Sequence, residues 1–107
     1  MRKSLSSLEH LRLFKALANE TRLTVLDWLK APVASFPPQV DGDLTVDGVC
    51  ADFIREKLGV AAATASRHLT LLTDAGLLIP TRRKGWTFYR RNEAAIRKFA
   101  KAIQASL

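Results

Sequence analysis

Cysteine and long apolar runs are what this sequence most clearly lacks. Cys50 is the single cysteine, so no disulfide can form within the chain. No run reaches the roughly 18 consecutive apolar residues that a membrane-spanning helix needs, and the first residues have no apolar segment typical of a secretion signal. These absences favour a protein of the reducing cytoplasm over a small secreted module held together by disulfides.

Acidic residues are few beside the basic ones. The 107 residues include 17 Lys and Arg against 10 Asp and Glu, which gives a formal net charge of +7. Such an excess on a small chain favours a polyanionic partner, above all nucleic acid. Because a chain of this length buries one modest core, we expect a single domain over residues 1–107 without a deep catalytic cleft.

Apolar residues recur at helical spacing in several segments. The pattern predicts helices over residues 8–18, 19–30, 49–58 and 61–75, and a last one after Asn92. Ser6 or Ser7, Asp47 and Asn92 are predicted to cap helix N-termini. Gly59 is predicted to end the third helix.

Residues 31–47 have a different composition from the rest of the chain. They carry three prolines and no Lys or Arg, which predicts an irregular inserted loop, with a short strand at 44–46. Asp41, Asp43 and Asp47 supply oxygen ligands that a hard cation would accept. The preferred interpretation is instead a solvated acidic loop that faces away from nucleic acid, because phosphates would repel it.

The third and fourth predicted helices are joined by the tight turn Gly59-Val60-Ala61, a spacing typical of a helix-turn-helix. Strand-like runs at 77–79 and 86–89 flank Lys84-Gly85, which predicts a β-hairpin. Residues 80–92 contain no acid and carry cations suited to holding phosphates: Arg82, Arg83, Lys84, Arg90 and Arg91. The expected fold is therefore mainly α with a small β-hairpin wing, a winged helix-turn-helix in the order α-α-α-α-β-β-α.

Ten residues of the fourth helix and the hairpin are the candidate DNA contacts: Ala62, Ala63, Thr64, Ser66, Arg67, Thr70, Arg82, Arg83, Lys84 and Gly85. Arg67 could bind a guanine edge or a phosphate, and the sequence does not separate these two roles. Ala61 and Ala62 cannot hydrogen-bond a base, although alanine can touch a thymine methyl group. Ala61 also leaves the helix without a side-chain cap.

Bulky residues beside these contacts have a simpler expected role. Trp86, Phe88 and Tyr89 are expected to pack the hairpin onto the core rather than to stack on bases. His68 lies near the inward side of its helix and is expected to be a packed, hydrogen-bonded histidine.

Three stretches match the pattern of a known family. FKALANETRL (residues 14–23), TASRHLTLLTDAGL (64–77) and GWTFYR (85–90) together resemble the ArsR family of bacterial repressors, and the similarity covers nearly the whole chain except residues 31–47. The resemblance implies operator binding by a homodimer joined through its first and last helices. The interface would then include Leu8, Leu11, Phe14, Ile96, Phe99 and Ile103.

The chain departs from the family's metal sensors. Those members carry Cys-x-Cys in the third helix, where this chain has Cys50 and Asp52. One thiolate and one carboxylate do not complete a tetrahedral site, so no metal or other cofactor is expected, and these two residues are only weak candidates. Cys50 is preferred as a buried helix residue, while a thiol switch between two chains stays open. The existence and identity of an inducer are left open.

The sequence therefore predicts a sequence-specific DNA-binding transcriptional regulator, a homodimeric repressor. An enzyme is not expected, because there is no His–acid pair at useful spacing, no phosphate-binding glycine loop and no nucleophile motif. The alternative is a winged-helix module that binds protein and does not read DNA sequence.

Overall fold

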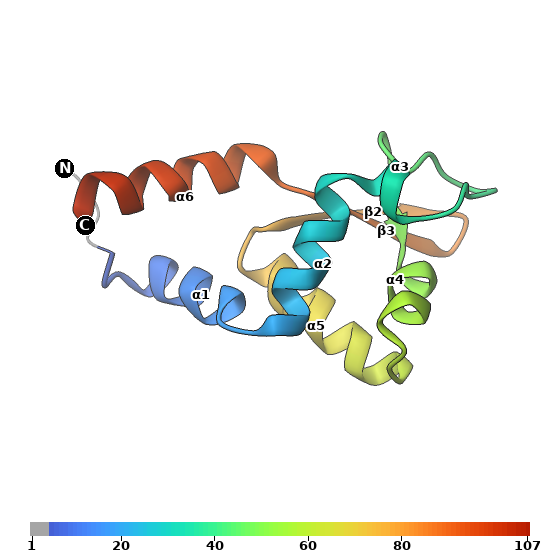
Figure 1. The fold of residues 1–107 in the computed structure, drawn as a ribbon, viewed down its shortest axis with the longest axis horizontal. Helices are drawn as coiled ribbons and strands as arrows, with labels where there is room; N and C mark the ends of the chain where they lie inside the picture. Colours follow the sequence, from blue (N-terminus) through green and yellow to red (C-terminus); the bar gives the residue numbers. More distant parts are fainter. Residues whose placement is uncertain (1–4) are drawn as a thin grey trace.

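The chain folds into helices packed around a small antiparallel sheet (Figure 1). The computed structural model describes residues 5–107. Its elements are α1 (Leu8–Leu17), α2 (Glu20–Lys30), α3 (Pro32–Ser35), β1 (Val49–Cys50), α4 (Ala51–Leu58), α5 (Ala62–Asp74), β2 (Leu78–Arg83), β3 (Trp86–Arg91) and α6 (Glu93–Ser106). The predicted order of helices and hairpin is confirmed, with α3 and β1 in addition. In this part of the chain, no helix is both long and apolar enough to cross a bilayer.

The sheet has three strands, with β3 in the middle and the order β1-β3-β2. All six residues of β2 pair with β3 in an unbroken antiparallel register. We call β2, β3 and the turn between them the wing. The short strand β1 adds Val49 opposite Tyr89 and Cys50 opposite Phe88. This pairing ties the start of α4, the first helix of the helix-turn-helix, to the wing.

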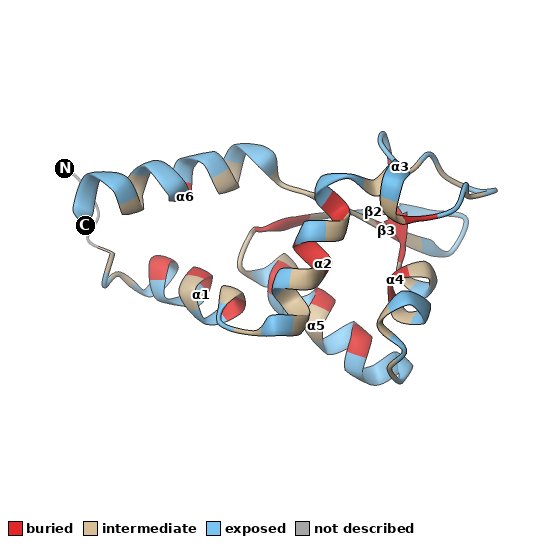
Figure 2. Ribbon diagram, viewed as in Figure 1, coloured by how far each residue is buried: buried red, intermediate tan, exposed pale blue. Residues whose placement is uncertain are grey.

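The core lies between α2, α4, α5 and the sheet (Figure 2). Ile54 of α4, Leu69 and Leu72 of α5 and Phe88 of β3 are almost wholly excluded from solvent. Ala65 is buried on the same stripe of α5, so the predicted inward residues of this helix are confirmed. Each large apolar side chain buried in this way contributes about 1.5–3 kcal/mol to folding.

The helix ends follow the predicted caps except at one place. The Ser7 and Asn92 side chains accept backbone N–H groups at the starts of α1 and α6, and Gly59 ends α4 in the left-handed conformation. The prediction that Asp47 caps the third helix is wrong, because α4 begins only at Ala51. The two residues before Ala51 are extended and pair with β3, a long-range contact that overrides the local capping pattern.

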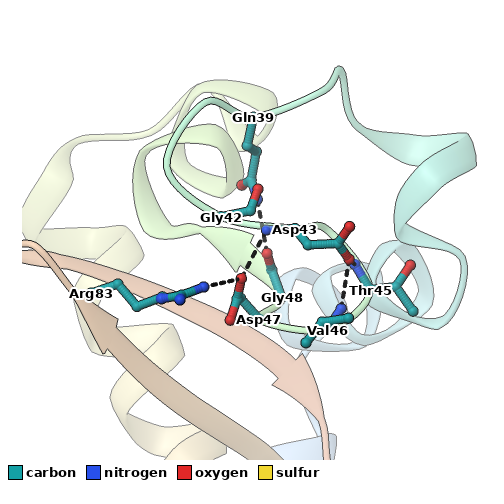
Figure 3. A network of polar contacts seen from close by, with 8 residues as sticks. All are labelled: Gln39, Gly42, Asp43, Thr45, Val46, Asp47, Gly48 and Arg83. Carbon is teal, nitrogen blue, oxygen red and sulfur yellow. Dashed lines mark hydrogen bonds and ion pairs between the residues drawn. The ribbon is translucent and has the colours of Figure 1, made fainter.

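The segment 31–47 is more ordered than the irregular loop that was predicted. Its beginning forms α3, with Pro32 at the first position, where a missing N–H removes no helical hydrogen bond. The strand predicted at 44–46 does not form. Asp43 Oδ1 instead accepts two backbone N–H groups of these residues, both at 2.8 Å, and holds them in a turn (Figure 3).

The end of this segment is anchored to the sheet. The Gln39 side chain donates to the Gly48 carbonyl at 2.9 Å and accepts the Cys50 N–H at 2.6 Å. Gly42 lies directly against the Phe88 ring, where a Cβ would come within 2.7 Å of the ring. The inserted segment is therefore packed on the base of the wing and is not a free loop.

Gly48 provides a test of this anchoring. It has a φ of +105°, and a Cβ there would lie 2.3 Å from the Tyr89 carbonyl oxygen. We expect Gly48→Ala to lower the free energy of unfolding by about 2–4 kcal/mol, measured by urea denaturation. Gly59→Ala is the matched control, because Gly59 also has a positive φ but open space around it, and it should cost only about 1 kcal/mol. Equal losses in the two variants would contradict the packing described for the β1–β3 pair.

Candidate nucleic-acid interface

The outer face of α5 carries the residues predicted to contact DNA. Because Ala65, Leu69 and Leu72 form the buried stripe, the opposite side of the helix faces solvent. All six predicted positions of this helix are exposed: Ala62, Ala63, Thr64, Ser66, Arg67 and Thr70. Asp74 is also exposed, at the C-terminal end of the helix. All of α5 before Asp74 is free of acid and is therefore suited to phosphates.

The N-terminus of α5 lacks a side-chain cap, as predicted. Ala61 occupies the capping position with an extended backbone, φ −64° and ψ 152°, and makes no side-chain hydrogen bond. The first N–H groups of a helix have no intrahelical partner, and they point outward with a partial positive charge. An anionic group placed there would satisfy them.

The turn of the wing has the geometry of a two-residue hairpin. Lys84 and Gly85 both have positive φ, 51° and 82°, as the favoured type I′ turn requires. Lys84 is the one non-glycine residue with positive φ in the described part of the chain. Both turn residues and the neighbouring Arg82 and Arg83 are exposed, so the wing presents its cations at its tip.

Arg83, however, is engaged within the protein. Its Nη1 donates to Asp47 Oδ2 at 2.9 Å (Figure 3). The same carboxylate oxygen accepts the N–H of Asp43, also at 2.9 Å. The Asp43 N–H and then the Arg83 guanidinium lower the pKa of Asp47, against the opposing effect of its burial. The expectation of a solvated acidic loop is therefore wrong at Asp47, which is buried and contacts the wing.

Arg83 reaches Asp47 and Arg82 does not, because neighbouring residues of a strand point to opposite faces of the sheet. Arg83 and the buried Phe88 lie on the face that meets the inserted segment, whereas Arg82 lies opposite Thr87 on the other face. Arg91, which was grouped with the wing cations, is half-buried and forms an ion pair with Glu93 at 2.9 Å. The cations of the wing that face solvent without a hydrogen bond or ion pair in the described structure are Arg82, Lys84 and Arg90.

The three wing aromatics divide between packing and exposure. Phe88 is buried in the core and Tyr89 is half-buried, so the expected packing role is confirmed for both. Burial raises the pKa of the Tyr89 hydroxyl, and the charge of Arg82 opposes that effect. Trp86 is 44% exposed and packs less than expected. It lies next to the turn, where an exposed ring is available to a partner.

His68 and Arg22 form a contact that sequence reasoning did not identify. His68 is half-buried on the flank of α5, and its Nδ1 accepts a hydrogen bond from Arg22 Nη1 at 3.2 Å. Burial lowers the pKa of His68, and the charges of Arg22 and Arg67 lower it further. The packed role predicted for His68 is confirmed. Arg22 belongs to the ALANETRL stretch, which was the only signal available for it in the sequence.

The weak metal candidates do not complete a cluster. Cys50 is buried in β1, and the Asp52 carboxylate is exposed, 4.0 Å from the Arg55 guanidinium. Within residues 5–107, no group of three or more His, Cys, Asp or Glu side chains is placed to hold a metal ion. Cys50 lies in a strand rather than in the predicted helix, because β1 replaces the first turn of that helix.

The predicted dimer residues lie on α1 and α6, which extend together to one end of the molecule (Figure 1). Phe14 and Phe99 contact each other within the chain, with ring centroids 5.1 Å apart, and Phe99 is buried. These two residues therefore join the helices of one protomer. The other four are exposed or half-buried: Leu8, Leu11, Ile96 and Ile103.

Sequence comparison finds a close relative. No model of a known protein family matches the chain. The HTH-type transcriptional regulator YbzH of Bacillus subtilis, itself described as uncharacterized, is 41% identical over 100 residues, a match that spans 94% of this chain and 100% of the relative. The similarity therefore includes the helix-turn-helix, the wing and the terminal helices.

Solved structures share the fold. A homodimeric winged helix-turn-helix DNA-binding domain from Mycobacterium bovis, of a possible ArsR-family transcriptional regulator, is 30% identical with a TM-score of 0.62, over 91% of this chain and 76% of that one. An ArsR-like transcriptional regulator from Rhodococcus sp. RHA1 has a TM-score of 0.66 at 24% identity, over 91% and 77% of the two chains, and supports the fold. These relatives are described as transcriptional regulators, the class that the sequence predicted. The chain belongs to the ArsR family of winged helix-turn-helix transcriptional regulators.

Proposed function

We propose that this regulator is a homodimeric repressor that binds a specific DNA sequence, with α5 in the major groove and the wing on the phosphate backbone. The observation that carries the proposal is the solvent-exposed face of α5 beside a wing whose tip is cationic and whose own residues include no acid. DNA binding would place the protein in the bacterial cytoplasm.

The outer face of α5 offers few groups that can read bases. Arg67 can bind a guanine edge or a phosphate, and Ser66 and Thr70 are short donors for either target. Ala62 and Ala63 can contact thymine methyl groups only. Direct readout by this helix is therefore sparse, and phosphate contacts and DNA shape would contribute a large share of the affinity.

The wing would bind the phosphate backbone of DNA through Arg82 and Lys84. Both are exposed, and neither takes part in an ion pair within the described structure. Arg83 is a weaker candidate, because binding a phosphate would require it to leave Asp47, 2.9 Å away. Releasing the buried Asp47 carboxylate from its guanidinium partner costs free energy that the phosphate contact would have to offset.

Homodimerisation through α1 and α6 is supported by the apolar surface that these two helices expose to solvent. Leu8 and Leu11 of α1 are 66% and 42% exposed. Grooves of about 690 and 520 Å³ run along α6, between it and α2 and between it and α1. A second copy would cover these apolar surfaces, and the Mycobacterium bovis relative is homodimeric. Two recognition helices about 34 Å apart would then require a palindromic operator.

The binding of DNA is tested by fluorescence anisotropy with labelled duplex from upstream of the protein's own gene and with a scrambled duplex of equal composition. We expect tighter binding to the upstream duplex, and affinity that falls steeply between about 50 and 200 mM salt, since cations are released from the phosphates. Equal binding to both duplexes would contradict sequence-specific reading. Absence of binding at low salt would favour the protein-interaction module.

The wing assignment predicts an unequal effect of neighbouring arginines. Arg82→Ala combined with Lys84→Ala should weaken binding to specific and scrambled DNA alike, and should reduce the slope of log affinity against log salt by about one for each lost phosphate contact. Arg83→Ala is the matched control, one residue away, and should leave the slope nearly unchanged. A larger slope change for Arg83→Ala would show that Asp47 releases it on DNA.

The dimer assignment predicts that a charge on the exposed side of α1 separates the protomers. Leu11→Glu should shift sedimentation equilibrium from dimer to monomer, because an unpaired carboxylate would be buried in the interface. It should leave the helical content measured by circular dichroism close to that of the unaltered protein, since Leu11 is already partly exposed. Val33→Glu, at an exposed apolar residue of α3, is the control and should remain dimeric. A dimeric Leu11→Glu protein would remove α1 from the interface.

A further inference from the structure

Arg22 lies where three helices meet. It belongs to the first turn of α2, and its side chain reaches α1 and α5. Nε donates to the Ala16 carbonyl at 2.7 Å and Nη2 donates to the Lys15 carbonyl at 3.1 Å. Nη1 donates to His68 Nδ1 at 3.2 Å. A single guanidinium thus links the end of α1 to the helix that carries the DNA-contacting face.

We propose that Arg22 and His68 act as positioning residues, which hold α5 at a fixed place relative to α1 and so set the placement of the recognition helices in the dimer. The inference rests on the proposed function and adds residues that do not themselves touch DNA. In a dimer joined through α1 and α6, any shift between α1 and α5 changes the distance between the two recognition helices. Palindromic half-sites tolerate little change in that distance.

The chemistry of each contact suits an arginine. The last carbonyls of a helix have no intrahelical donor and carry a partial negative charge, and Arg22 places a permanent cation on two of them. The planar guanidinium directs its N–H groups along fixed directions. It can therefore serve α1 and α5 at the same time, whereas a lysine ammonium is a single point that cannot span both.

The contact with His68 also fixes a protonation state. Arginine only donates hydrogen bonds, so His68 Nδ1 must be the acceptor and carry no proton. The neighbouring charges maintain this state: Arg22 approaches from α2, and Arg67 lies beside His68 on α5. The adjoining groove is lined by Arg12 and Lys15 of α1 and by Asp74, the one carboxylate among its described lining residues. Protonation of His68 would remove the acceptor and add a repelling charge.

Because the Arg22 contact requires a neutral His68, both the stability of the protein and its selective DNA binding should depend on pH. The pKa of His68 is below its usual value of 6.5, with burial as the largest cause. The stability that neutral His68 contributes is therefore present above pH 6.5 and is lost as the pH falls through the lower pKa of the folded protein. Selective DNA binding should weaken over the same range, because the Arg22–His68 contact opens.

The experiment compares Arg22→Lys, His68→Ala and His68→Asn with the unaltered protein. Each is assayed for anisotropy on specific and scrambled duplexes, for sedimentation and for urea stability. Arg22→Lys keeps the positive charge but loses the planar set of guanidinium N–H groups. We therefore expect the affinity for the specific duplex to fall by about tenfold or more, which corresponds to the loss of one charge-assisted hydrogen bond. Scrambled-DNA affinity and the dimer should be nearly unchanged. His68→Ala should share the defect of Arg22→Lys.

His68→Asn provides the rescue and the pH readout, because the amide oxygen can accept the Arg22 hydrogen bond without titrating. We expect it to restore specific binding near neutral pH and to bind independently of pH where the unaltered protein weakens. Arg22→Lys binding as tightly as the unaltered protein would overturn the inference while leaving the proposed function intact. The inference would also be overturned if the loss of specific DNA affinity in a variant merely followed the loss of folded protein in the urea measurement. Failure of His68→Asn to restore specific binding would overturn it as well. If the unaltered protein binds no DNA, the proposed function fails with it.

Discussion

The burial of one stripe of α5 is the constraint on which the rest of the structure depends. Ala65, Leu69 and Leu72 are almost fully enclosed, and burial of the two leucines contributes about 1.5–3 kcal/mol each. Because a helix cannot rotate without exposing such a stripe, the opposite face must point to solvent. That face carries the small and polar residues suited to a DNA groove. The same packing that stabilises the monomer therefore orients the surface that we assign to DNA.

The inserted segment and the wing act as one unit. Gln39, Gly42 and Asp47 each contact β1, β3 or the wing, so the segment supports the base of the hairpin. The ion pair of Asp47 with Arg83 occupies one of the cations at the tip of the wing. The wing is thereby held in place at the expense of one free positive charge, which leaves Arg82 and Lys84 at the tip, and Arg90 further along β3, as the wing cations available to phosphates.

Much of the fold could be predicted from the sequence because it depends on local patterns. Helical spacing, the caps Ser7 and Asn92 and the turn at Lys84-Gly85 act over a few residues, and the structure has all of them. The features that were predicted wrongly, or were missed, depend on contacts between residues far apart in the sequence. Asp47 resembles a helix cap, but its partner Arg83 lies 36 residues away. The two-residue strand β1 forms only because β3 is beside it, and the Arg22–His68 contact spans 46 residues, so neither leaves a local signal.

The most direct test of the account is nuclear magnetic resonance of the backbone amides during titration with the upstream duplex. If α5 and the wing bind DNA, the largest chemical-shift changes will lie in two places, the N-terminal part of α5 and the turn of the wing. Amides of α3 and of the exposed end of α6 should change little. Changes centred on α6 or on the inserted segment, with α5 unaffected, would show that the exposed face of α5 is not the DNA-binding surface.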